Sequence, residues 1–115
     1  MRDEILKAEE DFQQMVIEKG IQEAFYFFAD ENAVIKRGND TLIKGKENIK
    51  TFYSKYNGWK MELNWTPEFI DVAECGTLGY TYGRYVMTVD SVKDEGVFHT
   101  VWKRQPDKTW KYVWD

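Results

Sequence analysis

Residues 79–85, Gly-Tyr-Thr-Tyr-Gly-Arg-Tyr, decide the fold because large side chains alternate in them with small ones. Successive side chains of a β-strand point to opposite faces, so Tyr80, Tyr82 and Arg84 share one face. We expect this face to point inward, because a guanidinium flanked by phenols suits a concave pocket with a few polar groups aimed at a ligand. Alternatively, Tyr80 and Tyr82 fill the core and Arg84 forms a structural ion pair. The small residues between them suit the close approach of a second layer on the outside.

Aromatic residues on other predicted strands extend the pocket hypothesis. The sequence is 17% aromatic, and the polar tips of Trp and Tyr need partners when they are buried. Period-two alternation assigns several of these side chains to the inner face, and one indole N–H could point into the pocket as a donor. An aromatic core without a void is the alternative, because protein interiors are close-packed. The aromatic residues concerned are Trp65, Phe98, Trp102, Trp110, Tyr112 and Trp114, and Thr100 shares the strand face of Phe98 and Trp102.

Working outward from residues 79–85, the spacing of apolar residues predicts helices first and strands afterwards. Apolar residues have helical spacing both before and after Gly20, which predicts one helix on each side of it, and Gly45 opens a third helix. Between the second and third helices, turn-forming residues predict a small hairpin. We predict helices at 4–19, 21–29 and 46–57, and hairpin strands at 34–36 and 41–44.

The second half of the chain has period two, which is typical of half-buried strands. Pro67 should mark a bulge or bend, because proline cannot donate to a β-ladder. An acidic, glycine-containing segment, residues 90–96, is predicted as a loop. This order predicts an α+β domain with the helices packed on one face of a curved antiparallel sheet. The predicted strands are 59–73, 77–90, 97–104 and 109–114.

Composition limits the class of protein. A chain of 115 residues with 43% hydrophobic and 31% charged residues predicts one soluble domain spanning residues 1–115. A net charge of −4 without an extended basic stripe disfavours nucleic acid as a partner. No run of about 18 apolar residues favours a membrane, and no apolar leader follows Met1. As given, the sequence predicts a cytoplasmic protein, or a periplasmic or exported one if a signal peptide was removed.

Three titratable side chains are candidates for acid–base catalysis. His99 titrates near neutrality, but its alternation with Phe98 and Thr100 places it on the outer face or at a subunit contact; reversed facing would make it the best base. Asp30 follows a buried helix and could hang over the cavity mouth, although a turn cap is its more ordinary role. Asp71 lies among apolar residues, where burial would raise its pKa; the solvent side of an edge or bulge is the alternative. No Cys/His cluster has the spacing of a metal site.

The order of these elements resembles the nuclear transport factor 2-like superfamily, and in particular its SnoaL-like branch. The resemblance implies a cone-shaped, cystatin-like α+β fold with the helices packed in the curved sheet. It also implies that any catalysis is acid–base chemistry inside the cone, without a metal or an organic cofactor. The motifs that carry the resemblance are Phe28–Ala33 (FADENA), Trp65–Pro67 (WTP), Asp71–Ala73 (DVA), Gly76–Gly83 (GTLGYTYG), Val101–Arg104 (VWKR) and Trp110–Lys111 (WK).

The superfamily includes isomerases, dehydratases, epoxide hydrolases, polyketide cyclases and non-catalytic binding or assembly domains, so the fold leaves function open. Its steroid isomerases place a tyrosine on the inner face of the first helix, where this chain offers Phe12, Met15 and Val16. Arg84 aligns with an inward arginine in the association domain of a calmodulin-dependent kinase. That similarity favours ligand binding over catalysis.

We therefore predict a small-molecule-binding domain, with a pocket inside the cone for an apolar or aromatic ligand that bears an anionic or carbonyl group. A cofactor-independent enzyme of isomerase, dehydratase or cyclase type is the alternative, and a structural dimer with a filled core is a third possibility. The predicted outer set is too apolar to face water, so we expect a homodimer through the outer sheet face. That set is Thr81, Gly83, Tyr85, Met87, Val97, His99 and Val101.

Overall fold

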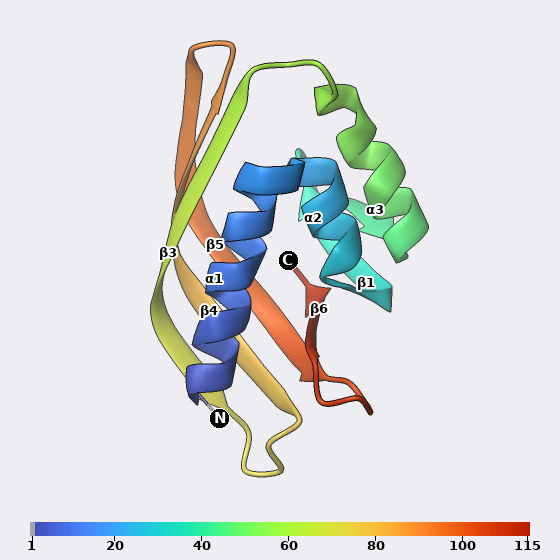
Figure 1. The fold of residues 1–115 in the computed structure, drawn as a ribbon, viewed down its shortest axis with the longest axis vertical. Helices are drawn as coiled ribbons and strands as arrows, with labels where there is room; N and C mark the ends of the chain where they lie inside the picture. The colour runs from blue at the N-terminus through green and yellow to red at the C-terminus, as the bar shows by residue number, and fades with distance from the viewer. Residues whose placement is uncertain (1) are drawn as a thin grey trace.

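The computed structural model describes residues 2–115, which form three α-helices and a curved six-stranded sheet (Figure 1). A short 3₁₀ turn, Ser54–Tyr56, follows the third helix. The helices are α1 (Arg2–Lys19), α2 (Ile21–Phe27) and α3 (Lys46–Tyr53). The strands are β1 (Ala29–Arg37), β2 (Thr41–Lys44), β3 (Met61–Val72), β4 (Leu78–Val89), β5 (Val92–Arg104) and β6 (Trp110–Trp114).

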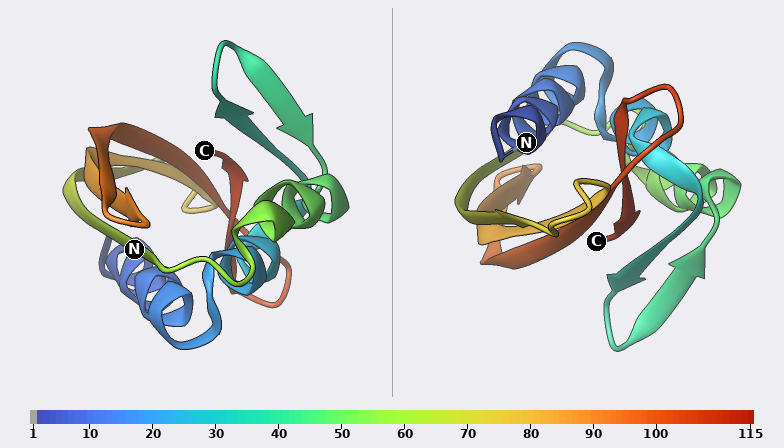
Figure 2. Two further views of the ribbon diagram at one scale, coloured as in Figure 1. Left: turned by 90° about the horizontal axis from the view of Figure 1, so that it is seen from above. Right: turned by 90° about the horizontal axis from the view of Figure 1, so that it is seen from below.

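The sheet has the strand order β2-β1-β6-β5-β4-β3, and the predicted α+β class is confirmed. One detail of the prediction is wrong, because the sheet is mixed: β1 and β6 run parallel, whereas the other neighbouring strands are antiparallel. The last strand inserts between β1 and β5, where the Tyr112 N–H donates to the Phe28 carbonyl at 2.9 Å. The β1–β2 hairpin projects away from the rest of the sheet (Figure 2).

Helix α1 packs across the concave face of the sheet because its apolar residues recur at helical spacing (Figures 1 and 2). Ile5, Phe12 and Val16 are buried on this side. The helix approaches β4 closely at Gly79, where an added Cβ would lie 2.5 Å from Cδ1 of Ile5. The small residues of β4 therefore do allow a close approach, but on the inner side of the sheet and not on the outer side as predicted.

The predicted bend at Pro67 is confirmed as a bulge in β3, where the pairing with β4 shifts between Pro67 and Phe69. The extra residue changes which side chains of β3 face inward. As a result Trp65 and Ile70, one on each side of the bulge, both pack with the core. Gly83 lies opposite the bulge, and a Cβ there would overlap the Thr66 carbonyl oxygen.

The predicted loop at residues 90–96 is wrong, because β4 and β5 are joined by a turn of two residues. Asp90 and Ser91 have φ values of 49° and 73°, which is the left-handed pattern of a type I′ turn. Val89 pairs directly with Val92 across this turn. Such turns are usually marked in sequences by Asn-Gly or Asp-Gly, and this one has no glycine.

The register that follows from this turn decides which faces of the two strands point inward. Thr81 pairs with Thr100, and both are buried, whereas Tyr82 pairs with His99 on the outer face. Tyr80 and Tyr82 are each 43% exposed, and Arg84 is also exposed. The prediction that Tyr80, Tyr82 and Arg84 face inward is therefore wrong.

The core lies between the concave face of the sheet and the helices. No helix within residues 2–115 combines the length and the apolar character needed to cross a membrane. The buried apolar residues are Ile5, Ala8, Phe12, Val16, Ile21, Ala24, Phe25, Phe28, Ala29, Ala33, Ile35, Ile49, Tyr53, Leu63, Ile70, Trp102, Trp110 and Tyr112.

Candidate functional site

A cavity of about 450 Å³, open to solvent on one side, is lined by residues of the three helices and of the sheet. Phe12, Phe25, Trp65 and Phe98 contribute aromatic walls, and Glu9 is a polar group among them. Small-molecule sites in proteins typically have volumes of about 300–1,000 Å³, apolar walls and a few converging polar groups. This cavity has the size and the lining of such a site.

Glu9 is the acidic side chain at the centre of the inner face of α1, and only 2% of its surface is exposed. Its Oε1 atom accepts hydrogen bonds from Thr81 Oγ1 at 2.7 Å and from Trp102 Nε1 at 3.0 Å. Its Oε2 atom accepts one from Trp65 Nε1 at 2.7 Å. Three different strands therefore hold one carboxyl group of the first helix in place.

Burial raises the pKa of Glu9, and the negative charge of Asp115 adds to this effect. The three donors oppose the shift, because hydrogen bonds to a carboxylate stabilise its charged form. The pKa remains raised because burial is the largest of these effects. A carboxyl group in such a setting can accept or donate a proton nearer to neutral pH than an exposed glutamate can.

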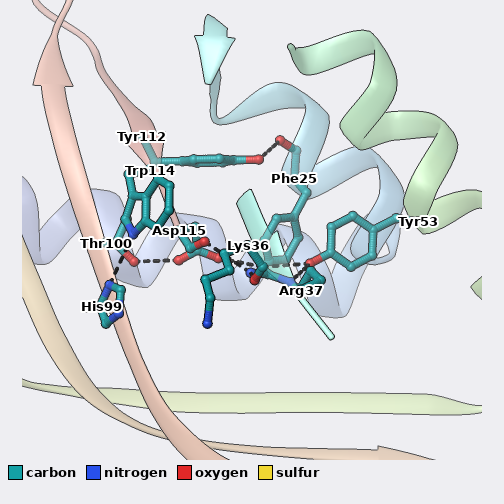
Figure 3. Close-up of polar contacts among 9 residues, drawn as sticks. All are labelled: Phe25, Lys36, Arg37, Tyr53, His99, Thr100, Tyr112, Trp114 and Asp115. Carbon is teal, nitrogen blue, oxygen red and sulfur yellow. Dashed lines mark hydrogen bonds and ion pairs between the residues drawn. The ribbon is translucent and has the colours of Figure 1, made fainter. Parts of the chain in front are cut away.

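A second polar cluster joins β1 to the residue after β6 (Figure 3). The Arg37 guanidinium donates from Nη2 to Asp115 Oδ2 at 2.7 Å and from Nη1 to the Asp115 carbonyl at 3.1 Å. Thr100 donates from its hydroxyl to Asp115 Oδ1 at 2.7 Å. Asp115 also extends the pairing of β6 with β1, because the Lys36 N–H donates to its carbonyl at 3.0 Å. Both carboxylate oxygens of Asp115 thus have donors.

Tyr53, on α3, completes this second cluster. Its buried hydroxyl oxygen accepts from Nε and Nη2 of Arg37 at 3.0 and 2.9 Å (Figure 3). Burial raises the pKa of the Tyr53 phenol, so the group stays protonated near neutral pH. Burial alone lowers the pKa of Arg37, but Tyr53 and Asp115 outweigh it, so the guanidinium keeps its charge. The cavity therefore contains one ion pair whose charges balance.

His99 lies at the rim of the cavity, on the outer face of β5. Its Nδ1 accepts from Trp114 Nε1 at 3.2 Å, and the two rings are parallel, with centroids 6.4 Å apart (Figure 3). The predicted outward facing of His99 agrees with this position. A bulge in β6 explains why Trp114 joins it there: the pairing of β5 with β6 shifts between Val101 and Trp102.

Comparison with known proteins identifies the fold. No model of a protein family matches the chain, and no curated protein matches it. A nuclear transport factor 2-like protein of unknown function from Shewanella oneidensis superimposes with a TM-score of 0.78 and 17% identity, over 98% of this chain and 94% of that one. A nuclear transport factor 2-like protein with a cystatin-like fold from Novosphingobium aromaticivorans gives 0.75 and 15%, over 98% and 77%. This chain has the nuclear transport factor 2-like fold.

A third structure of the same fold contains a bound molecule. It is a protein from Catenulispora acidiphila in complex with S-DNPA, with a TM-score of 0.71 and 12% identity, over 97% of this chain and 87% of that one. At this level of identity the likeness concerns the nuclear transport factor 2-like fold alone.

Two of the predicted ligand-binding tryptophans meet at Glu9 inside the nuclear transport factor 2-like cone. The indole N–H groups of Trp65 and Trp102 donate to its carboxyl group, so neither is free to bind a ligand. Trp114 lies outside with His99. The sequence correctly grouped Trp65 with Trp102 but missed the residue that holds them.

The other predicted residues do not line the cavity. Asp30 accepts from the Asn32 N–H at 2.9 Å and from Gln105 Nε2 at 3.0 Å, which is the turn-capping role considered as its alternative. Asp71 is exposed and pairs with Tyr80 on the outer side of the sheet, so it is not the buried acid considered above. Arg84 is exposed and lies 3.8 Å from a carboxylate oxygen of Glu68.

Glu9, Arg37, Tyr53 and Asp115 were not identified from the sequence. A signal existed for Glu9, because it stands four residues after Ile5 and three before Phe12, on the apolar side of the helix. An acid at such a position is unusual and indicates a buried partner. Within residues 2–115, no three His, Cys, Asp or Glu side chains gather closely enough to hold a metal ion.

Proposed function

We propose that this protein binds a small, largely apolar or aromatic molecule in the cavity inside the cone. The observation that carries the proposal is the cavity of about 450 Å³ with aromatic walls and a buried carboxyl group, Glu9, at its edge. The complex of the Catenulispora acidiphila protein with S-DNPA supports a binding role for the fold. We expect a ligand about the size of two fused aromatic rings, because the volume lies in the range of small-molecule sites.

The sequence suggested Arg84 as the partner for the polar group of the ligand, but Arg84 lies outside the cavity. The charged groups in the cavity that could face the polar group of a ligand are Glu9 and the pair of Arg37 and Asp115. Since Arg37 already has a carboxylate partner, the case for an anionic ligand is weaker than the sequence indicated.

A fragment screen by thermal shift and NMR tests the binding proposal. Met87→Trp fills space at the cavity wall, whereas Val86→Trp places the same ring on the other side of β4. Aromatic fragments should raise the melting temperature of the wild type and of Val86→Trp, and raise that of Met87→Trp less. Equal stabilisation of all three proteins by the same fragments would place binding outside the cavity.

Acid–base catalysis is the second candidate function. The observation that favours it is Glu9, a cavity carboxyl group whose pKa is raised by burial. A catalytic acid or base must come within about 3 Å of the proton that it transfers, directly or through one water molecule. Turnover of a carbonyl compound that is lost in Glu9→Gln, while the ligand still binds, would favour an enzyme over a binding protein.

We also propose that a second copy of this chain covers the outer sheet face. Large apolar side chains are exposed there, and Arg84 lies beside Glu68, so a two-fold axis through the face can set each charge against its opposite. Light scattering on wild type and Tyr82→Asp tests this, and a monomeric wild type would reject it. The exposed residues are Phe69, Leu78, Tyr80, Tyr82 and Val97.

A further inference from the structure

Within the part of the chain that the structure describes, the buried carboxyl group of Glu9 has no cationic partner. Its three hydrogen-bond donors are a hydroxyl and two indole N–H groups, which are all uncharged. Among residues 2–115, no Lys, Arg or His lies within ion-pair distance of it. Buried carboxylates in proteins are normally paired with a cation, because removing an isolated charge from water is costly. When Glu9 is ionised, residues 2–115 therefore supply no counter-charge to it.

One hydrogen-bonding position of this carboxyl group is still open. A carboxylate can accept about four hydrogen bonds, two at each oxygen. Oε1 of Glu9 already accepts two, from Thr81 and Trp102, whereas Oε2 accepts one, from Trp65. Glu9 is among the residues that line the cavity, although only 2% of its surface is exposed, and we infer that a bound molecule supplies the fourth donor at Oε2.

The surroundings of Glu9 favour a positive donor. Phe12 and Trp65 form an edge-to-face pair beside it, with ring centroids 5.1 Å apart, and aromatic faces attract cations. The negative charge of Asp115 raises the pKa of Glu9 in the same direction as burial does. The cation Arg37 is paired with Asp115 and not with Glu9.

Two lysines at the rim of the cavity have partners of their own. Lys36 forms an ion pair with Asp40 at 3.2 Å, and its side chain is half exposed to solvent. Lys55 lies over the Phe52 ring, 4.0 Å from its centroid. Neither lysine forms an ion pair with Glu9.

We propose that the ligand carries a protonated amine on its aromatic body and that Glu9 accepts an N–H of this amine at Oε2. The inference rests on the proposed binding function and adds the chemical class of the ligand. The amine replaces the missing counter-charge, and the rings of the cavity pack against the aromatic body. A neutral alcohol of the same shape makes the hydrogen bond without the charge.

Naphthylmethylamine and naphthylmethanol are matched probes for this inference, because they differ only in an ammonium against a hydroxyl group. By isothermal titration calorimetry at neutral pH, the wild type should bind the amine roughly tenfold more tightly, the increment expected of a charge-assisted hydrogen bond. Glu9→Gln should remove this preference. Glu10→Gln, which removes an exposed carboxylate from the next position of α1, should retain it.

Indole N–H resonances report where the amine binds. The signals of Trp65 and Trp102, which donate to Glu9, should move when the amine is added, and that of Trp114 should not. An amine preference that is absent in the wild type, or that persists in Glu9→Gln, overturns the inference and leaves the binding function standing. Failure of both probes to bind the wild type counts against the binding function as well.

A pH series provides the same information if Glu9→Gln does not fold. The groups that face Glu9 from β3, β4 and β5 are Trp65, Thr81 and Trp102, which do not titrate in this range. Asp115, after β6, acts on Glu9 by its charge and is itself paired with Arg37 of β1. The amine stays protonated as the pH falls, whereas Glu9 loses its charge. The ratio of amine to alcohol affinity should therefore fall towards one at acid pH, and a constant ratio overturns the inference.

Discussion

The two faces of β4 contrast in side-chain size and in burial: the small side chains face the core and the large ones face outward. On the inner face Thr81 is fully buried and donates to Glu9, and Gly79 and Gly83 make room for α1 and for the bulge of β3. On the outer face Tyr82 is 43% exposed and stacks with Phe69, with ring centroids 5.3 Å apart. The side chains of the inner face are small because α1 and the backbone of β3 lie close to it.

This contrast teaches that the composition of one strand does not assign its faces. Tyr80, Tyr82 and Arg84 look like a binding site because they are large and polar, but in a sheet covered by a helix the inward positions have less space. What assigns the faces is the pairing with the neighbouring strand, and a slip of one residue turns every side chain to the other face.

The largest effect should come from adding a methyl group to the inner face. Gly83→Ala places a Cβ against the Thr66 carbonyl oxygen, and backbone cannot move away as a side chain can. We expect the free energy of unfolding to fall by about 3 kcal/mol, the upper range for overpacking. Urea denaturation followed by circular dichroism measures it. An unchanged midpoint would contradict the close approach of β3 at this position.

Loss of one donor to Glu9 should have the next largest effect. Trp102→Phe removes an indole N–H and part of a fully buried ring, so we expect destabilisation of about 2 kcal/mol. Trp114→Phe is the matched control, because its N–H donates to His99 at the outer face, and should cost about 0.5 kcal/mol. Equal losses in the two variants, measured by urea denaturation, would remove the distinction between the faces.

Much of the fold follows from local patterns in the sequence. Apolar spacing predicted the helices, alternation predicted most strands, and Pro67 predicted the bulge, because each depends on neighbouring residues. The register of β4 with β5 depends instead on a two-residue turn, Asp90–Ser91. Both residues have left-handed backbone conformations, but neither is the glycine that usually marks such a turn in a sequence. The sequence predicted the inner face of β5 correctly and that of β4 wrongly. In the observed register Thr81 lies opposite Thr100 and Tyr82 lies opposite His99, so the two predicted inner faces cannot both point inward.

The candidate site was less predictable because long-range contacts build it. The Arg37–Asp115 pair joins residues 78 positions apart, and it exists because β6 lies beside β1 in the sheet. No local pattern places those two strands side by side. Glu9 is the exception, since an acid on the apolar side of α1 was visible in the helical spacing.

Titration of Glu9 should give a pH-dependent difference between wild type and Glu9→Gln. Burial raises the pKa of Glu9 in the folded protein, so the folded state holds its proton to higher pH than the unfolded chain does. The stability of the wild type relative to the variant should therefore fall as pH rises from about 4.3, the ordinary value for glutamate. The decline ends above the folded pKa, and it amounts to about 1.4 kcal/mol for every pH unit that separates the folded pKa from the unfolded one.

Urea denaturation across this pH range, with Glu10→Gln as the exposed control, measures the difference. Glu10 is on the solvent side of α1, so its removal should leave the slope of stability against pH unchanged. A wild type that gains stability relative to Glu9→Gln as pH rises would mean that the three donors outweigh burial. The carboxyl group would then be held as a permanent anion.

The smallest effect should come from Arg84, the residue that the sequence placed at the centre of the pocket. Its nearest carboxylate oxygen, on Glu68, is 3.8 Å away and both side chains are more than half exposed, so Arg84→Ala should change stability by less than about 0.5 kcal/mol. Naphthylmethylamine should stabilise wild type and Arg84→Ala equally in a thermal-shift experiment, because the residue lies on the outer face. A reduced shift in the variant would bring Arg84 back into the binding site, through a change of register or through binding on the outer face, and the indole signals of Trp65 and Trp102 distinguish these two.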